Sequence, residues 1–160
     1  MNVLVDSSVW SLALRRNTTN DAIAIVKVLR DLIADGRVVL LGAIRQEVLS
    51  GVRYKEQFTR LQEYLRAFPD LDLTTEDFEL AAEFFNTCRS NGVQGSNTDF
   101  LLCAVAHRRG YSILTTDKDF ENFRSHIPVV FRSQFGKIKA IALSDNKGDR
   151  PLTSPPRCRH

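Results

Sequence analysis

The stretch NVLVDSSVW, residues 2–10, joins a short apolar run to an acid, Asp6, and to two serines. An apolar run of this kind predicts a buried strand, and the residues that follow it favour the start of a helix. Similar short runs alternate with longer helical patterns along most of the chain. This alternation is typical of an α/β fold built on a parallel sheet.

The same patterns give the order of the expected elements. Five strands are predicted, at Asn2–Val5, Val38–Leu41, Leu71–Leu73, Ser112–Thr115 and Val129–Phe131. Seven helices are predicted, near Ser8–Arg15, Asn20–Asp35, Ile44–Val52, Lys55–Ala67, Thr75–Asn91, Thr98–Arg109 and Lys118–Phe123. Together they indicate a small, doubly wound, five-stranded sheet that is mainly parallel.

Composition excludes several other classes of protein. With 160 residues, 43% hydrophobic and 26% charged, the chain is ordinary for one globular domain and unlike a disordered or collagen-like sequence. Its three cysteines are widely spaced and form no CxxC pair, so neither a disulfide framework nor a zinc site is indicated. The first residues lack the basic start of a secretory signal, and no apolar stretch is long enough to span a membrane. These features predict a cytoplasmic protein.

The basic charge of the chain is concentrated near its end. Residues 133–160 hold six of the 22 basic side chains and two of the 19 acidic ones. Their net charge is therefore +4, compared with +3 for the whole chain. Residues 1–132 then carry −1. Residues 133–143 are predicted to form an edge strand or a docking segment, and residues 144–160, rich in Ser, Pro and charge, a flexible basic tail.

Two acids lie in the first third of the chain. Asp6 follows a strand directly, and ligands of open parallel sheets bind beyond the carboxyl ends of the strands, although helix capping alone also explains an aspartate there. Glu47 flanks the apolar stripe of Ile44, Val48 and Gly51, so it is expected to lean toward the core, where an acid seldom lies without a partner. A glutamate paired with a nearby arginine on the helix surface is the alternative.

Three further acids follow in the second half. Asp99 opens the apolar helix NTDFLLCAVAHRRG, where the helix dipole by itself favours a negative charge. Asp117 and Asp119 follow the strand SILTT, and one is expected to point into the cleft above the sheet while the other bonds to backbone.

Topology places these acids together. All strands of a parallel sheet end at the same edge. A helix that follows a strand starts at this edge, and a helix that precedes a strand runs antiparallel to it and therefore starts there too. Asp6, Glu47, Asp99 and Asp117 are therefore expected on one rim, with Asp6 and Asp117 close if their strands are neighbours. Clustered carboxylates repel unless a cation neutralises them, and oxygen ligands without His or Cys select Mg²⁺ or Mn²⁺.

These residues resemble the PIN domain family, specifically the VapC-type toxins of bacterial toxin–antitoxin pairs. VLVDSSVW is similar to the opening strand of the family, Glu47 with Gly51 to its second acidic helix, and NTDFLLCAVAHRRG to its Asp-led helix. ILTTDKDF is similar to its Thr-x-Asp-x-Asp-Phe signature. The resemblance covers residues 1–132, and the basic tail departs from the usual chains of the family.

The resemblance implies a Rossmann-like α/β/α sandwich, a homodimer and a Mg²⁺- or Mn²⁺-dependent endoribonuclease that a cognate VapB-like antitoxin inhibits. It assigns catalysis to Asp6, Glu47, Asp99 and Asp117, of which Asp6, Asp99 and Asp117 bind the metal. Ser7 and Asp119 would support them.

Five cations near the rim are candidates for RNA phosphate contacts, which need only placed positive charge. They are Arg15, Arg16, Arg45, Arg53 and Lys118.

Three other interpretations remain. A phosphoacceptor signalling module would have adjacent acids after its first strand and a lysine after its last, and this chain has neither. A non-catalytic PIN-like binding domain would be expected to lack one or more of the acids, all of which are present. A PIN nuclease that acts in RNA processing outside toxin–antitoxin systems is not distinguished by the residues.

Overall fold

A computed structural model describes residues 1–15 and 19–131 of the chain. Within them, three parallel strands form one sheet in the order β2-β1-β3, with β1 at Val3–Val5, β2 at Val38–Val39 and β3 at Ser112–Leu114. Val5 pairs with Leu114, so the first strand and the strand before Asp117 are neighbours, as the site prediction requires.

The expected five-stranded sheet is wrong at its two edges. Leu40 forms an isolated parallel bridge with Asp70, the residue before the predicted strand Leu71–Leu73, and Ile113 forms one with Phe131, the last residue of the predicted strand Val129–Phe131. A proline precedes each bridge closely, Pro69 and Pro128, and proline cannot donate to a strand ladder. Neither proline can extend the pairing on the N-terminal side of its bridge, and within the described residues each edge keeps a single bridge.

All seven predicted helices are present, with ends that differ by at most two residues from those expected. They are α1 at Ser7–Ala13, α2 at Asn20–Ala34, α3 at Gly42–Ser50, α4 at Lys55–Leu65, α5 at Thr75–Ser90, α6 at Asn97–Arg109 and α7 at Asp119–Arg124. None of the helices in the described part of the chain has the length and apolar character needed to cross a membrane.

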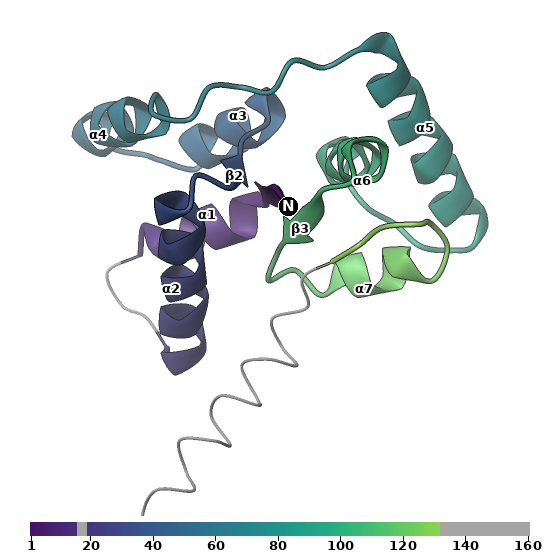
Figure 1. The fold of residues 1–160 in the computed structure, drawn as a ribbon, viewed down its shortest axis with the longest axis horizontal. Helices are drawn as coiled ribbons and strands as arrows, with labels where there is room; N and C mark the ends of the chain where they lie inside the picture. The colour runs from purple at the N-terminus through teal and green to yellow at the C-terminus, as the bar shows by residue number, and fades with distance from the viewer. Residues whose placement is uncertain (16–18, 132–160) are drawn as a thin grey trace, which may run out of the picture.

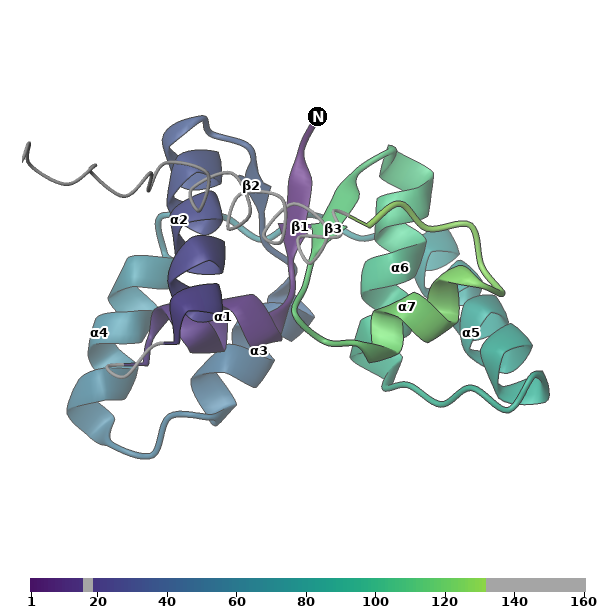
Figure 2. The same ribbon diagram turned by 90° about the horizontal axis from the view of Figure 1, so that it is seen from below.

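The helices cover both faces of the sheet. In Figure 1 the strands are seen nearly end-on, with α1 and α2 on one side and α3 and α6 on the other. Figure 2 shows β1 running away from the N-terminus, so that α1 starts at the carboxyl edge of the sheet. The chain also leaves β3 toward α7 at this edge and enters α6 there.

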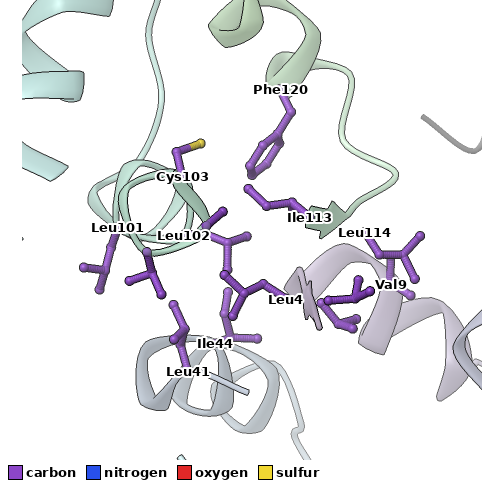
Figure 3. Packing of buried hydrophobic residues seen from close by; sticks show 14 of the residues in the cluster. Leu4, Val9, Leu41, Ile44, Leu101, Leu102, Cys103, Ile113, Leu114 and Phe120 are labelled. Atoms are coloured by element: carbon purple, nitrogen blue, oxygen red, sulfur yellow. The ribbon is translucent and has the colours of Figure 1, made fainter. Parts of the chain in front are cut away.

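The core extends over both faces of the sheet, and α6 is its most buried helix. Every residue of α6 from Phe100 to Ala106 is buried, as its uniformly apolar sequence predicts. Figure 3 shows Leu102 of this helix and Ile44 of α3 beside Leu4 of β1. Burial of this central helix fixes the position of its first turn, where Asp99 lies.

Several predictions fall outside the described residues. They are the edge or docking segment at 133–143, the flexible tail at 144–160, and the RNA contact assigned to Arg16.

Candidate metal centre

The carboxyl edge of the sheet brings three of the predicted acids near one another. The backbone nitrogen of Asp6 donates to the carbonyl of Leu114 at 3.0 Å, which ties the end of β1 to the end of β3. Asp117 lies three residues after the end of β3, and the charges of both Asp6 and Asp117 act on Asp99. The sheet and the start of α6 thus form one acidic rim, at the lower edge of the sheet in Figure 2.

Asp6 is the most enclosed of these acids, with 4% of its surface exposed. Its Oδ2 accepts from the hydroxyls of Ser8 at 2.6 Å and Thr115 at 2.9 Å, and from the Ser8 backbone at 3.4 Å. Its Oδ1 has only the Ser7 hydroxyl, at 3.5 Å, among the described residues. One oxygen of Asp6 is therefore saturated by the protein, and the other has almost no donor.

Asp117 is the acid that bonds to backbone, one of the two roles that we expected Asp117 and Asp119 to divide. Its Oδ1 accepts from the backbone nitrogen of Asp119 at 2.9 Å, which caps the turn into α7. Its own backbone nitrogen donates to Thr115 at 3.0 Å. The Asp119 side chain is exposed and makes no hydrogen bond with the described residues. Asp117 can thus brace the loop with one oxygen and leave the other for a ligand.

Asp99 is held by a capping box at the start of α6. Its Oδ2 accepts from the Ser96 backbone at 2.8 Å, and its backbone donates to the Ser96 hydroxyl at 3.1 Å. Burial raises the pKa of Asp99, and so do the charges of Asp6 and Asp117, against the lowering effect of the Ser96 hydrogen bonds. The negative charge of this carboxylate is therefore only partly compensated by the protein.

The structure places Glu47 differently from the prediction. Its side chain is exposed and forms no hydrogen bond or ion pair with the described residues, although its neighbours Ile44 and Val48 are buried. Gly51 of the same predicted stripe is exposed too. Glu47 therefore lies on the solvent side of α3, although the next residue, Val48, is buried.

The chemistry of these residues fits a hard divalent cation. Among the described residues, no three His, Cys, Asp or Glu side chains are grouped closely enough to hold one ion together, so the predicted four-carboxylate cluster is not preformed. Mg²⁺, however, keeps several waters and is usually bound by one or two carboxylates. The under-donated oxygen of Asp6 and the raised pKa of Asp99 mark where such an ion would relieve negative charge.

The cations predicted near the rim differ in their availability. Arg45 donates from Nε to Asp70 at 2.8 Å and also to the Phe68 carbonyl, so it holds the segment after α4 and is not free for RNA. Arg15, Arg53 and Lys118 are exposed and form no ion pair with the described residues.

Sequence reasoning missed two polar residues of the rim. It selected Ser7 beside Asp6, whereas the short contacts come from Ser8 and Thr115. The signal was present as DSS and TTD, two strand ends that each carry a hydroxyl within two residues of an acid.

The structural role of Gly95 was also missed. A Cβ there would lie 2.6 Å from Phe123 and 2.9 Å from Phe100, so only glycine lets the turn before Ser96 pack on α7.

Residues 3–125 match the model of the PIN domain, which spans more than half of the chain. The chain therefore belongs to the PIN domain family, whose members are typically metal-dependent nucleases.

Solved structures show the same fold at low sequence identity. A chain of VapBC2 from Rickettsia felis, bound to a DNA fragment from its promoter, is 14% identical with a TM-score of 0.66, over 82% of this chain and 98% of that one. A chain of FitAcB from Neisseria gonorrhoeae is 19% identical with a TM-score of 0.64, over 83% and 98%. A chain of VapBC-5 from Mycobacterium tuberculosis, a member of the VapBC family of toxin–antitoxin systems, is 18% identical with a TM-score of 0.58, over 82% of this chain and 98% of that one.

Proposed function

We propose that this protein is a Mg²⁺- or Mn²⁺-dependent endoribonuclease that acts as the toxin of a VapBC-type toxin–antitoxin pair. The observation that carries the proposal is the partly compensated charge of Asp99 beside Asp6 and Asp117 at the carboxyl edge of a PIN sheet. Its similarity in fold to chains of VapBC and FitAB complexes supports the toxin role.

The residues divide the work as follows. Asp6 and Asp99 would hold the cation, with Asp117 and Glu47 completing its surroundings directly or through water. When bound, Mg²⁺ or Mn²⁺ supplies activation of a water and stabilisation of charge at the scissile phosphate. Exposed Arg15, Arg53 and Lys118 would contact flanking phosphates of the RNA backbone.

Cleavage of RNA by the purified protein tests the enzyme. Cleavage is expected with Mg²⁺ or Mn²⁺ and is expected to stop in EDTA, and Asp6→Asn should be inactive at either metal. Arg66→Gln, at the exposed C-cap of α4 and outside the proposed site, serves as the control that should cleave like the wild type. Full activity in EDTA would overturn the metal-dependent mechanism.

One face of the molecule supports a protein partner. Three adjoining hollows of about 360, 260 and 460 Å³ lie along α1, α2 and α4, and neighbouring hollows share Leu14, Tyr64, Val26 and Arg30. Leu14, Ile23 and Tyr64 are about half exposed there. A contiguous exposed apolar area of this kind is typical of an interaction surface.

The chemistry of this face suggests the kind of segment that covers it. Lys27, Arg30 and Arg60 line the hollows and form no ion pair with the described residues. The buried Trp10 Nε1, at the wall of the central hollow, has no acceptor among them. An amphipathic antitoxin segment with acidic side chains would match the charges. A cationic side chain elsewhere in the antitoxin is expected to occupy the acidic rim.

Growth of a bacterial host tests the toxin role. Induced alone, the wild type should arrest growth and Asp6→Asn should not, while the product of a small neighbouring gene should restore growth and co-purify. Ile23→Glu should lose this co-purification yet still cleave RNA. If wild-type expression is harmless and no small partner binds, the RNA-processing PIN nuclease becomes the better account.

The homodimer is part of the proposal. A further hollow of about 460 Å³ is lined by Ala43, Phe85 and Leu101, with Phe78 about half exposed beside it. A second copy of this chain would cover these apolar groups. Light scattering should give twice the monomer mass for the wild type and the monomer mass for Phe78→Asp.

A further inference from the structure

Two hydroxyl groups lie between the Asp6 carboxylate and the backbone that carries Asp117. The Ser8 Oγ atom is 2.6 Å from Asp6 Oδ2 and 3.1 Å from the backbone nitrogen of Thr116. The Thr115 Oγ1 atom is 2.9 Å from the same Oδ2 and 3.0 Å from the backbone nitrogen of Asp117. Each hydroxyl thus joins the acid after β1 to one of two consecutive N–H groups after β3.

The chemistry of the four bonds fixes the donor in each. A backbone N–H can only donate, so each hydroxyl oxygen accepts from Thr116 or Asp117. An ionised carboxylate can only accept, so the single proton of each hydroxyl goes to Asp6 Oδ2. No proton is left for the 3.4 Å approach between the Ser8 and Thr115 oxygens, which is a contact and not a fifth hydrogen bond.

This arrangement has a consequence for both acids. Oδ2 of Asp6 is turned toward β3 and saturated, so Oδ1 is the oxygen left for a ligand. The backbone of Asp117 is held at the same time by Thr115. We propose that Ser8 and Thr115 are positioning residues that select the metal-binding oxygen of Asp6 and fix Asp117 beside it. This inference rests on the proposed metal-dependent function.

Helix capping does not account for the arrangement. Asp6 is the N-cap of α1, but its capping bond from the Ser8 backbone is 3.4 Å long, whereas the two hydroxyl bonds are 2.6 and 2.9 Å. The Thr115 bond also joins residues more than a hundred positions apart in the sequence, and Asp6 and Thr115 are both buried, which excludes most water. The two hydroxyls therefore join two strands, a role that a cap does not need.

Binding of Mn²⁺ without RNA tests the inference. The spin-resonance signal of free Mn²⁺ gives the dissociation constant for the full chain and for Thr115→Val, Thr115→Ser and Ser8→Ala. Loss of a group that orients a metal ligand typically weakens metal binding by about 10- to 100-fold. We expect at least a tenfold rise of the dissociation constant for Thr115→Val and Ser8→Ala, and near wild-type binding for Thr115→Ser, which restores the hydroxyl.

Ser11→Ala is the matched control, because Ser11 lies one turn further along α1 and makes no side-chain hydrogen bond with the described residues. It should bind Mn²⁺ like the wild type. Equal binding by Thr115→Val and the wild type would overturn the positioning role while leaving the metal site intact. Absence of Mn²⁺ binding by the wild type would overturn the proposed function and this inference together. Circular dichroism identifies any variant that does not fold, and Thr115→Ser and Ser8→Ala then decide the question.

Discussion

A carboxylate lies at each end of α6, one beside positive charges and the other beside negative charges. At its end, the fully buried Asp77 of α5 pairs with Arg108 and with Arg109 at 3.3 Å. At its start, Asp99 has two other carboxylates as electrostatic neighbours. The pKa of Asp77 is lowered, because hydrogen bonds from the Thr74 backbone and Arg108 outweigh its burial, whereas the pKa of Asp99 is raised.

This difference separates a structural acid from a candidate functional one. Asp77 also completes a capping box with Thr74 at the start of α5, and its ion pairs with Arg108 and Arg109 join α5 to α6. Asp99 makes a capping box as well, with Ser96, yet its charge stays under-compensated. A capping role therefore does not tell the two acids apart, whereas the charges around them do.

Neutralising the acid at the start of α6 should give the largest effect, and on activity. Because the loss of an orienting partner already costs about 10- to 100-fold, Asp99→Asn should lower Mn²⁺-supported RNA cleavage by at least about a hundredfold. Its melting temperature without metal should stay level or rise, because repulsion from Asp6 and Asp117 is relieved. Cleavage assays and thermal melts measure the two quantities, and an unchanged cleavage rate would contradict the assignment of Asp99.

Neutralising the acid at the other end should act on stability instead. Asp77→Asn leaves two arginines without their partner, and breaking a buried ion pair costs about 3–5 kcal/mol. Because both arginine side chains are about a third exposed, we expect a loss of about 2–3 kcal/mol in the free energy of unfolding. Urea denaturation measures this loss. Glu79→Gln, an exposed residue of α5, is the control and should change little.

The contributions of Asp77 and Asp99 to the free energy of unfolding should also change with pH in opposite directions. The lowered pKa of Asp77 means that its stabilising contribution is present above the unfolded value of about 3.9 and is lost as the pH falls through the folded pKa. The raised pKa of Asp99 means that its contribution is complete below about 3.9 and is lost as the pH rises through the folded pKa.

Unfolding free energies between about pH 2 and 7 test these signs. Asp77→Asn should approach the wild type as the pH falls. The expected excess stability of metal-free Asp99→Asn over the wild type should disappear toward the same acidic limit. An excess that instead grows on acidification would contradict the sign assigned to Asp99.

Most of the fold could be predicted from local sequence, since each helix has its own apolar period and each central strand its own apolar run. The pairing of the two edge segments could not be predicted in this way. It depends on partners elsewhere in the sequence and on the N–H groups that remain beside Pro69 and Pro128. The burial of α6 was predictable from its uniformly apolar residues, because apolar side chains are more stable away from water.

The site was predictable only in part. Residue type and strand ends were sufficient to select Asp6, Asp99 and Asp117, because parallel topology brings such positions to one edge. The contacts of Ser8 and Thr115 depend on the β1–β3 register, which the sequence does not state. The pairing of Arg45 with Asp70 depends on how the chain returns after α4, which is equally non-local.

Glu47 gives the smallest expected effect and decides how far the acidic rim extends. It is exposed and without a partner among the described residues, so it can reach a cation only through water or after a change of side-chain conformation. Loss of such an indirect partner costs about 10-fold at the low end of the range for outer ligands, so Glu47→Gln should lower cleavage about tenfold and Asp99→Asn far more. Cleavage rates at saturating Mn²⁺ compare the two, with Glu63→Gln on exposed α4 as the control. If Glu47→Gln is as inactive as Asp99→Asn, Glu47 is a direct ligand and α3 must move toward the rim when the metal binds.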